Sequence, residues 1–335
     1  MIEEVTRHRL DGLEPDNLLA FLALLGLLRT LEVADQAQQE SIKLRPRGFW
    51  DLDLPPLRPV LSVAQPVTRK DLAGAVSKGV SILTSTNSFG DRKDLNYTRS
   101  EAREMLERAA YNATAADHNA ADLLASLMSD AAVKDDKNSK TGTIDPTPLC
   151  LLFGQGHQHF LERLVHVPIE PAPPPRGKGA AALAISEAEC LEEALFAPWQ
   201  RSDPTFSFRW DPDEDVRHAL MPGDPTDSAY KSGTQHGANR LAALGLAVLT
   251  LVPETRAGRI RPRVLGGSFS REGFSFSWPI WKEPATLSAI RALLGHSDLH
   301  KPGGLGHLGV DHVLTAKRIV VGKFINFARA RVSDS

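Results

Sequence analysis

Basic, amide and aromatic side chains of the kind that bind nucleic acids gather in three stretches of this sequence. The first comprises Asn87, Phe89, Arg92, Lys93, Asn96, Tyr97 and Arg99, the second Lys231, Gln235, His236, Asn239 and Arg240, and the third Lys317, Arg318 and Lys323. Cationic groups bind phosphates, amides bond to phosphates or base edges, and rings stack on bases. The second stretch also stands where a helix is expected to begin, and the helix dipole favours phosphate there. We therefore expect three nucleic-acid-binding patches; the alternative for each is a solvated loop or surface.

Sequence motifs of several enzyme classes are missing or incomplete. The phosphate loop Gly-x4-Gly-Lys-Ser/Thr and the nucleophile elbow Gly-x-Ser-x-Gly do not occur. Residues 304–309 match Gly-x-Gly-x-x-Gly, but the polar residues 298–302 precede them where a dinucleotide site needs a strand. We interpret this segment as a flexible glycine loop.

An acidic cluster at residues 211–215 has the alternating aspartates of a calcium-binding loop. The pattern fails further on, because Val216 occupies the position of the invariant glycine and Pro222 that of the bidentate glutamate. A turn that follows a strand explains the cluster better than a metal site does.

The histidines and cysteines also lack the spacing of metal ligands. His157 and His159 are two residues apart and His307 and His312 are five apart, so neither pair shares one face of a helix. The two cysteines, Cys150 and Cys190, stand far from any second ligand and are expected to be buried thiols. We predict no metal and no cofactor, and a binding protein in preference to an enzyme.

Composition and hydropathy indicate an ordered protein of the cytoplasm. The chain has 335 residues, of which 42% are hydrophobic and 24% charged, enough for one large domain or two modest ones. The longest apolar run is residues 18–28, shorter than the ~20 residues that span a bilayer. Two glutamates near the start are unlike a signal sequence, and two cysteines suit a reducing compartment.

Charge is unevenly distributed along the chain, although the formal net charge is only −2. Residues 186–230 carry eleven acidic and three basic side chains, whereas residues 256–331 carry thirteen basic and four acidic ones. Such polarity could present a basic face to a phosphate backbone and an acidic face to a protein partner. The alternative is that the two segments neutralise each other within the fold.

Periodicity and turn signals predict an α+β fold in two lobes. Asn17 is expected to cap a helix that is apolar on nearly all sides, which makes it the buried central helix of an N-terminal, mainly helical lobe. Gly26 in this helix would let another backbone pack close. The expected domains are residues 1–167 and 181–335, the second a mixed lobe with antiparallel strands, joined by a Pro/Gly-rich linker at 168–180.

The remaining elements follow from the same signals. Helices are expected at residues 70–83, 99–111, 117–133, 238–251 and 287–294, and at 186–196 behind a capping box of Ser186 and Glu189. Extended segments are expected at residues 5–10, 43–52, 60–67, 206–210, 260–264 and 274–280, and over a terminal β-rich run at 319–332.

Three segments of the chain resemble CRISPR-associated effector subunits encoded at type I-G (formerly I-U) loci. They are residues 10–29 followed by Phe49-Trp50, the motif Arg209-Trp210-Asp211-Pro212-x-Glu214-Asp215, and the motif 237–242. The resemblance implies a large-subunit-like component, or the separate form of an extension found on the helicase–nuclease of these systems. Its implied partners are crRNA, target DNA, and other effector subunits or the helicase–nuclease.

We therefore interpret the sequence as a non-catalytic nucleic-acid-binding or scaffold subunit of a type I CRISPR effector. Two alternatives stay open. One is a hydrolase or nuclease whose site combines residues distant in sequence, with His236 or His157 as the base. The other is a protein-interaction module without nucleic-acid contact.

Overall fold

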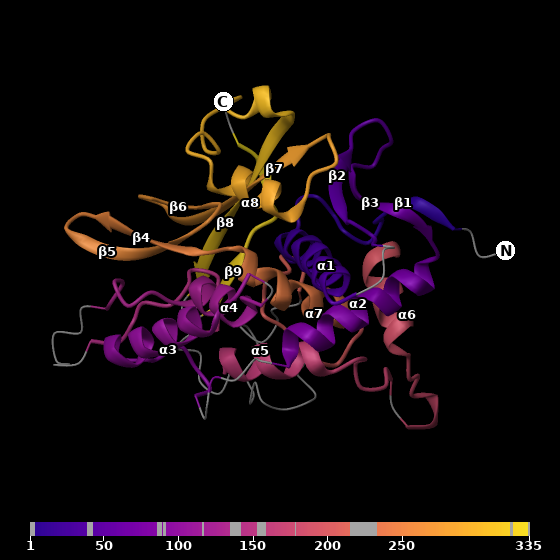
Figure 1. The fold of residues 1–335 in the computed structure, drawn as a ribbon, viewed down its shortest axis with the longest axis horizontal. Helices are drawn as coiled ribbons and strands as arrows, with labels where there is room; N and C mark the ends of the chain where they lie inside the picture. The colour runs from indigo at the N-terminus through magenta and orange to yellow at the C-terminus, as the bar shows by residue number, and fades with distance from the viewer. Residues whose placement is uncertain are drawn as a thin grey trace.

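The structure is a computed structural model that describes residues 4–38, 43–85, 89, 92–115, 117–134, 142–152, 159–177, 179–214, 233–321 and 324–333. It confirms the α+β fold: helices prevail in the first half of the chain and antiparallel strands in the second (Figure 1). Within the described residues, no helix combines the length and the apolar character needed to cross a membrane.

Helix α1 (Leu18–Gln36) is the buried central helix that its sequence predicts. The Asn17 side chain caps it by accepting a hydrogen bond from the backbone N–H of Ala20, and every residue from Leu18 to Leu31 is buried. A helix without a polar face is stable only when other elements cover it all round.

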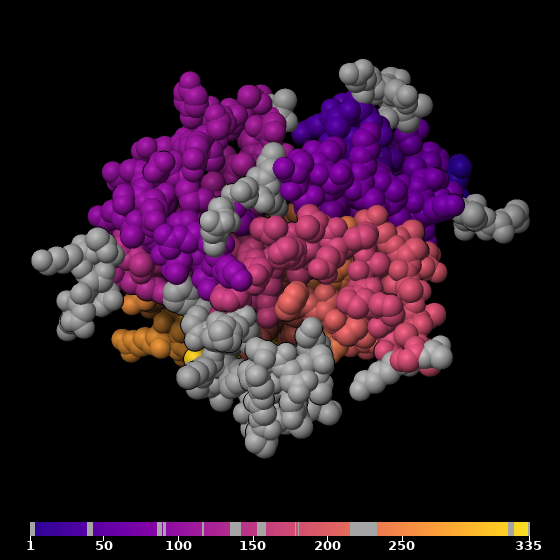
Figure 2. Space-filling model, turned by 90° about the horizontal axis from the view of Figure 1, so that it is seen from below, coloured from indigo at the N-terminus to yellow at the C-terminus, as the bar shows by residue number. Residues whose placement is uncertain are grey.

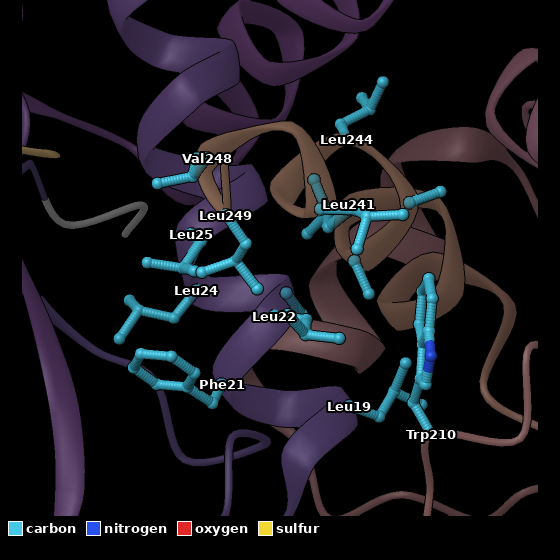
Figure 3. Close-up of a cluster of buried hydrophobic side chains, with 14 of the residues drawn as sticks. Leu19, Phe21, Leu22, Leu24, Leu25, Trp210, Leu241, Leu244, Val248 and Leu249 are labelled. Carbon is cyan, nitrogen blue, oxygen red and sulfur yellow. The ribbon is translucent and has the colours of Figure 1, made fainter. Parts of the chain in front are cut away.

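Helix α7 (His236–Gly245) is the main partner of α1, although more than 200 positions separate the two in sequence. Leu19, Leu22 and Leu25 of α1 meet Leu241 of α7 and Leu249 beyond it in one apolar cluster (Figure 3). The short 3-10 helix η4 (Leu246–Val248) continues α7. The helix expected over 238–251 therefore begins at His236 and ends earlier than predicted, because Leu251 is already the first residue of a strand.

The described residues form further helices and 3-10 turns besides this pair. They are α2 (Arg69–Thr84), α3 (Arg99–Asn112), α4 (Asn119–Leu127), α5 (Phe160–Ile169), the 3-10 turn η1 (Gly179–Ala181), α6 (Glu187–Phe196), α8 (Leu287–Gly295) and the 3-10 turn η5 (Gly306–Leu308). The predicted capping box of Ser186 and Glu189 opens α6, and Thr98 with Glu101 forms another at α3. Helix α4 is shorter than predicted because the chain becomes extended at Met128, and α5 was not predicted.

The strands form three separate antiparallel sheets. The first has the order β1 (Val5–Arg9), β3 (Arg58–Val67), β2 (Arg47–Asp51). The second has the order β10 (Arg331–Val332), β8 (Val310–Val321), β7 (Gly273–Trp281), β6 (Gly267–Ser270), and β9 (Phe324–Phe327) pairs with β8. The third is a two-stranded hairpin of β4 (Leu251–Arg256) and β5 (Arg259–Val264).

The strand expected at residues 206–210 is wrong. Its backbone N–H groups do not join a sheet: the N–H of Phe208 bonds to Oδ1 of Asn239 and that of Arg209 to Oγ of Ser207. Arg209 has a positive φ of 63°, which is incompatible with a regular strand. The aromatic residues that suggested a strand, Phe208 and Trp210, instead stack on each other at 4.5 Å within the core.

One apolar core runs through both halves of the chain. It includes residues of α1 and α5 together with residues of α7 and β7, so it crosses the segment 168–180 that was expected to separate two domains. Trp50 and Trp281 meet edge to face at 6.1 Å, and Trp281 donates a hydrogen bond to the Gly48 carbonyl. Arg176, within the expected linker, bonds to Glu193 and Asp203 of the second half of the chain.

Candidate nucleic-acid interface

The two aromatic rings of the first expected patch lie in the core. Phe89 and Tyr97 are buried, and the Tyr97 hydroxyl donates to the Phe89 carbonyl over 3.2 Å. Neither ring presents a free face on which a base could stack. The expectation of exposed stacking residues here is therefore corrected, and Asn87 lies outside the described residues.

The cationic residues of the first patch are exposed but mostly paired. Arg92 forms an ion pair of 2.6 Å with Glu101 and reaches Asn96 at 3.4 Å, and Lys93 pairs with Glu162 at 3.1 Å. Arg99 is exposed at the start of α3. Such surface pairs contribute only ~0–1 kcal/mol each, so a phosphate could displace the carboxylates.

The second expected patch is internal. Gln235, His236, Asn239 and Arg240 are all buried, with side chains no more than 2% exposed. Asn239 donates to Oγ1 of Thr234 over 2.8 Å and to the Gln235 carbonyl over 3.0 Å. The expected exposed patch is therefore wrong for these four residues, because their polar groups are bonded inside the protein at the start of α7. Lys231 lies outside the described residues.

Arg240 and His236 fasten the segment after α5 to α7. The Arg240 guanidinium donates to the carbonyls of Pro168 and Pro171 over 3.1 Å each and to the Glu187 carboxylate over 2.8 Å. The Nε2 atom of His236 lies 2.8 Å from the Glu170 carbonyl, and burial lowers the pKa of this imidazole. The neutral ring therefore donates from Nε2, and a base role for His236 would need access that this arrangement does not offer. His157, the other suggested base, lies outside the described residues.

The third expected patch is only partly available. Lys317 is exposed and pairs with Glu272 at 2.6 Å. Arg318 turns inward, donates to the Pro148 carbonyl over 3.1 Å and lies 5.3 Å from the centre of the Phe274 ring; burial lowers the pKa of its guanidinium. Lys323 lies outside the described residues.

The hairpin β4–β5 forms a basic surface that was not named among the expected site residues. In its register Arg256 is opposite Arg259, Glu254 opposite Arg261, and Val252 opposite Arg263. Residues directly opposite each other in an antiparallel pair share a face, and side chains two apart on one strand do so too. All four arginines therefore lie on one face, which we call the arginine ribbon: Arg256, Arg259, Arg261 and Arg263.

The opposite face of the hairpin anchors it to the body. Leu251, Pro262 and Val264 are buried there, whereas Ile260 near the tip is 43% exposed. The two residues of the connecting turn both have a positive φ, 49° at Ala257 and 76° at Gly258. This is the pattern of a type I′ turn, whose twist matches that of the two strands it connects. Figure 1 shows the hairpin extending from the body beside β6, and its orange strands also emerge at one edge in the view from below (Figure 2).

The arginine ribbon carries more cations than its own two strands carry acidic residues. Glu254 is the one acidic residue in the two strands, and it pairs with Arg263 at 3.5 Å. Arg256 and Arg259 are direct cross-strand neighbours, and like charges in that position destabilise a hairpin. Burial raises the pKa of Asp145, and the nearby cations Lys134, Arg261 and Arg318 oppose that rise. Arg261 and the inward Arg318 thus interact electrostatically with the same carboxylate.

Part of the signal for this ribbon was present in the sequence. The residues Arg259-Ile260-Arg261-Pro262-Arg263 place a cation at every second position at and just before the strand predicted over 260–264, which puts all three on one face if the strand begins at Arg259. The fourth arginine, Arg256, lies on the same face because the hairpin register places it opposite Arg259. This register could not be predicted, since Ala257-Gly258 is not one of the usual sequence signals of a two-residue turn.

No family model matches this chain, and the search of curated proteins gives no match either. Among the described residues, no three or more His, Cys, Asp or Glu side chains come together in a way that could hold a metal ion.

Proposed function

We propose that this protein is a non-catalytic nucleic-acid-binding subunit whose main contact is the arginine ribbon. The observation that carries the proposal is the placement of four arginines on one face of a projecting hairpin that has a single acidic residue. A two-stranded ribbon is narrow enough to enter the major groove of a duplex, and guanidinium groups bind phosphates with two parallel hydrogen bonds. The exposed Arg99 and Lys317 offer further cations in other parts of the surface.

We propose further that the complex it serves is a type I CRISPR effector, with crRNA or target DNA as the ligand. This step depends on the resemblance of three sequence segments to type I-G subunits. In the structure these segments pack on one another: Nδ2 of Asn17 bonds to Asp211 over 2.9 Å, and the N–H of Leu19 bonds to the Trp210 carbonyl. Because these segments lie at the centre of the fold, their resemblance to type I-G subunits supports a fold in common with those subunits more than a common binding site.

Binding measurements with charge-matched variants test the first step. In the ribbon variant, Arg256, Arg259, Arg261 and Arg263 are replaced by glutamine; in the control, four exposed cations elsewhere are replaced by glutamine: Lys78, Arg108, Lys282 and Lys301. Fluorescence anisotropy with labelled 20-mer duplex DNA, single-stranded DNA and single-stranded RNA should show a loss of roughly 10- to 100-fold for the ribbon variant and a much smaller loss for the control. Equal losses in the two variants would show that only net charge matters.

Co-expression tests the second step. When the chain is produced with the remaining subunits of a type I-G effector and a CRISPR array, it should co-elute with crRNA and the repeating backbone subunit. Elution of the chain alone, while the other subunits assemble with crRNA, would reject membership of that complex and would leave nucleic-acid binding by the ribbon untouched.

A further inference from the structure

A groove of about 590 Å³ lies beside strand β1. Strand β1 and the β4–β5 hairpin, which carries the arginine ribbon, lie at opposite ends of the molecule (Figure 1). Its walls come from β1, from the first turns of α2 and from α6. A volume in this range is typical of sites that bind small molecules or short peptides.

The groove follows the free edge of a sheet. Strand β1 is the end strand of the order β1–β3–β2, and among the described residues it pairs with β3 alone. The consecutive residues Arg7, His8 and Arg9 all line the groove. Because successive side chains of a strand point to opposite faces, a groove that all three line runs along the strand's edge, where main-chain N–H and C=O groups are unpaired.

The cations of the groove are less fully paired than its carboxylates. Arg7 and Lys70 form no ion pair with any residue that the structure describes, and Arg69 reaches Glu192 only at 4.0 Å. Of the acidic residues, Glu189 is engaged in the capping box of α6, and Asp11 accepts from Arg9 at 2.8 Å. The guanidinium of Arg7 lies 5.7 Å from the centre of the Phe49 ring and that of Arg69 lies 4.3 Å from the centre of the Phe196 ring, contacts that leave their charge in place. The groove therefore offers positive charge on the side of β1 and α2.

His8 adds an unmet hydrogen-bonding group. Its side chain is 3% exposed, one ring nitrogen bonds to the Val5 backbone, and Nε2 has no partner within the described residues. A ring whose other nitrogen donates to a carbonyl leaves Nε2 as an acceptor, and this atom is itself buried at the wall of the groove.

We propose that this groove binds an extended, acidic peptide segment of a partner protein, which adds to β1 as a further strand. Main-chain hydrogen bonds to the free edge would supply affinity, and a carboxylate placed against Arg7 and Lys70 would supply specificity. A compact anion fits less well, because Glu189 and Glu192 stand on the facing wall. The site depends on observations separate from those of the arginine ribbon.

Three synthetic probes test this inference by calorimetry and amide hydrogen exchange. The first is a capped six-residue peptide of alternating glutamate and threonine, the second has lysine in place of glutamate, and the third is the glutamate peptide with N-methylated amides. The glutamate peptide should bind roughly tenfold more tightly than the lysine peptide and should slow exchange of β1 amides. The N-methylated peptide keeps the charges but cannot pair with a strand, so it should not bind.

Matched variants complete the test. Replacing Arg7 and Lys70 by glutamate should reverse the preference between the two unmodified peptides, and the ribbon variant should bind the glutamate peptide as the native chain does. Equal binding of the N-methylated peptide, unchanged exchange of β1, or full displacement by inorganic phosphate at constant ionic strength would each overturn strand addition. The last result would mark a site for small anions.

Discussion

Gly26 of α1 lies directly against the main chain of Leu241 in α7, so that a Cβ atom at position 26 would overlap the Leu241 carbonyl. The contact is reciprocal, because a Cβ at Gly245 of α7 would overlap the carbonyl of Leu22 in α1. Two glycines thus let the two most buried helices approach at backbone distance. This crossing joins the two halves of the chain into one core.

Replacement of Gly26 by alanine should therefore destabilise the protein even though alanine favours helices. The added methyl group meets backbone, which cannot move aside cheaply, and we expect a loss of about 1–3 kcal/mol or more in the free energy of unfolding. Gly74→Ala is the matched control, because nothing lies within 4 Å of a Cβ there and α2 should gain up to about 1 kcal/mol. Urea denaturation of both variants measures the difference, and a Gly26→Ala variant as stable as the native chain would contradict the close crossing.

Arg240→Ala should unfold the protein more readily without acting on a nucleic-acid site. The substitution leaves the Pro168 and Pro171 carbonyls without their donor and Glu187 without its cation, so we expect a loss of about 3–5 kcal/mol. Arg240→Lys should recover little, since an ammonium cannot reach three acceptors in a fixed fork. If the Arg240→Ala variant were as stable as the native chain but bound nucleic acid more weakly, Arg240 would be part of the nucleic-acid interface, contrary to this account.

The carboxyl of Glu214 should make stability depend on pH. Burial raises its pKa from 4.5 to about 7, while Ser207 and neighbouring arginines act against that rise. The folded state then holds a proton that the unfolded state has released, so the contribution of Glu214 to stability is fully present below pH 4.5 and is lost as the pH rises to about 7. Chemical denaturation at several pH values should show a smaller decline for Glu214→Gln than for the native chain. Parallel pH profiles would show that Glu214 is not the responsible group.

The turn of the arginine ribbon can be improved without a change of charge. Ala257 has a φ of 49°, a left-handed conformation that asparagine adopts at lower cost. Ala257→Asn should slow amide exchange in β4 and β5 by an amount equivalent to about 0.5–1 kcal/mol while leaving nucleic-acid affinity the same or slightly higher. Faster exchange in the variant would contradict the type I′ geometry.

The parts of the fold that local chemistry determines could be predicted from the sequence. Asn17 caps α1, Ser186 and Glu189 cap α6, and the all-apolar helix is central, because each of these depends on neighbouring residues or on one helix alone. The close approach at Gly26 was also expected, although its partner in α7 was not, since the two are more than 200 positions apart.

The candidate site could be predicted much less well. Polar residues such as Arg240 and Asn239 look like surface groups in a sequence, and only the carbonyls of residues 168–171 and the backbone of Phe208 show that they are satisfied inside. The same applies to Tyr97, whose hydroxyl is paired within the core. The arginine ribbon could not be predicted in full, because only the register between β4 and β5 shows that the arginines of both strands share one face.

The salt dependence of nucleic-acid binding tests the role of the arginine ribbon most directly. Plots of log K against log salt concentration, for a duplex 20-mer with the native chain, the ribbon variant and the charge-matched control, report how many phosphates are neutralised. If the four arginines contact phosphates, the slope of the ribbon variant should be shallower than the native slope by about 3–4, while the control keeps a nearly native slope. A ribbon variant with the native slope would contradict the proposed interface.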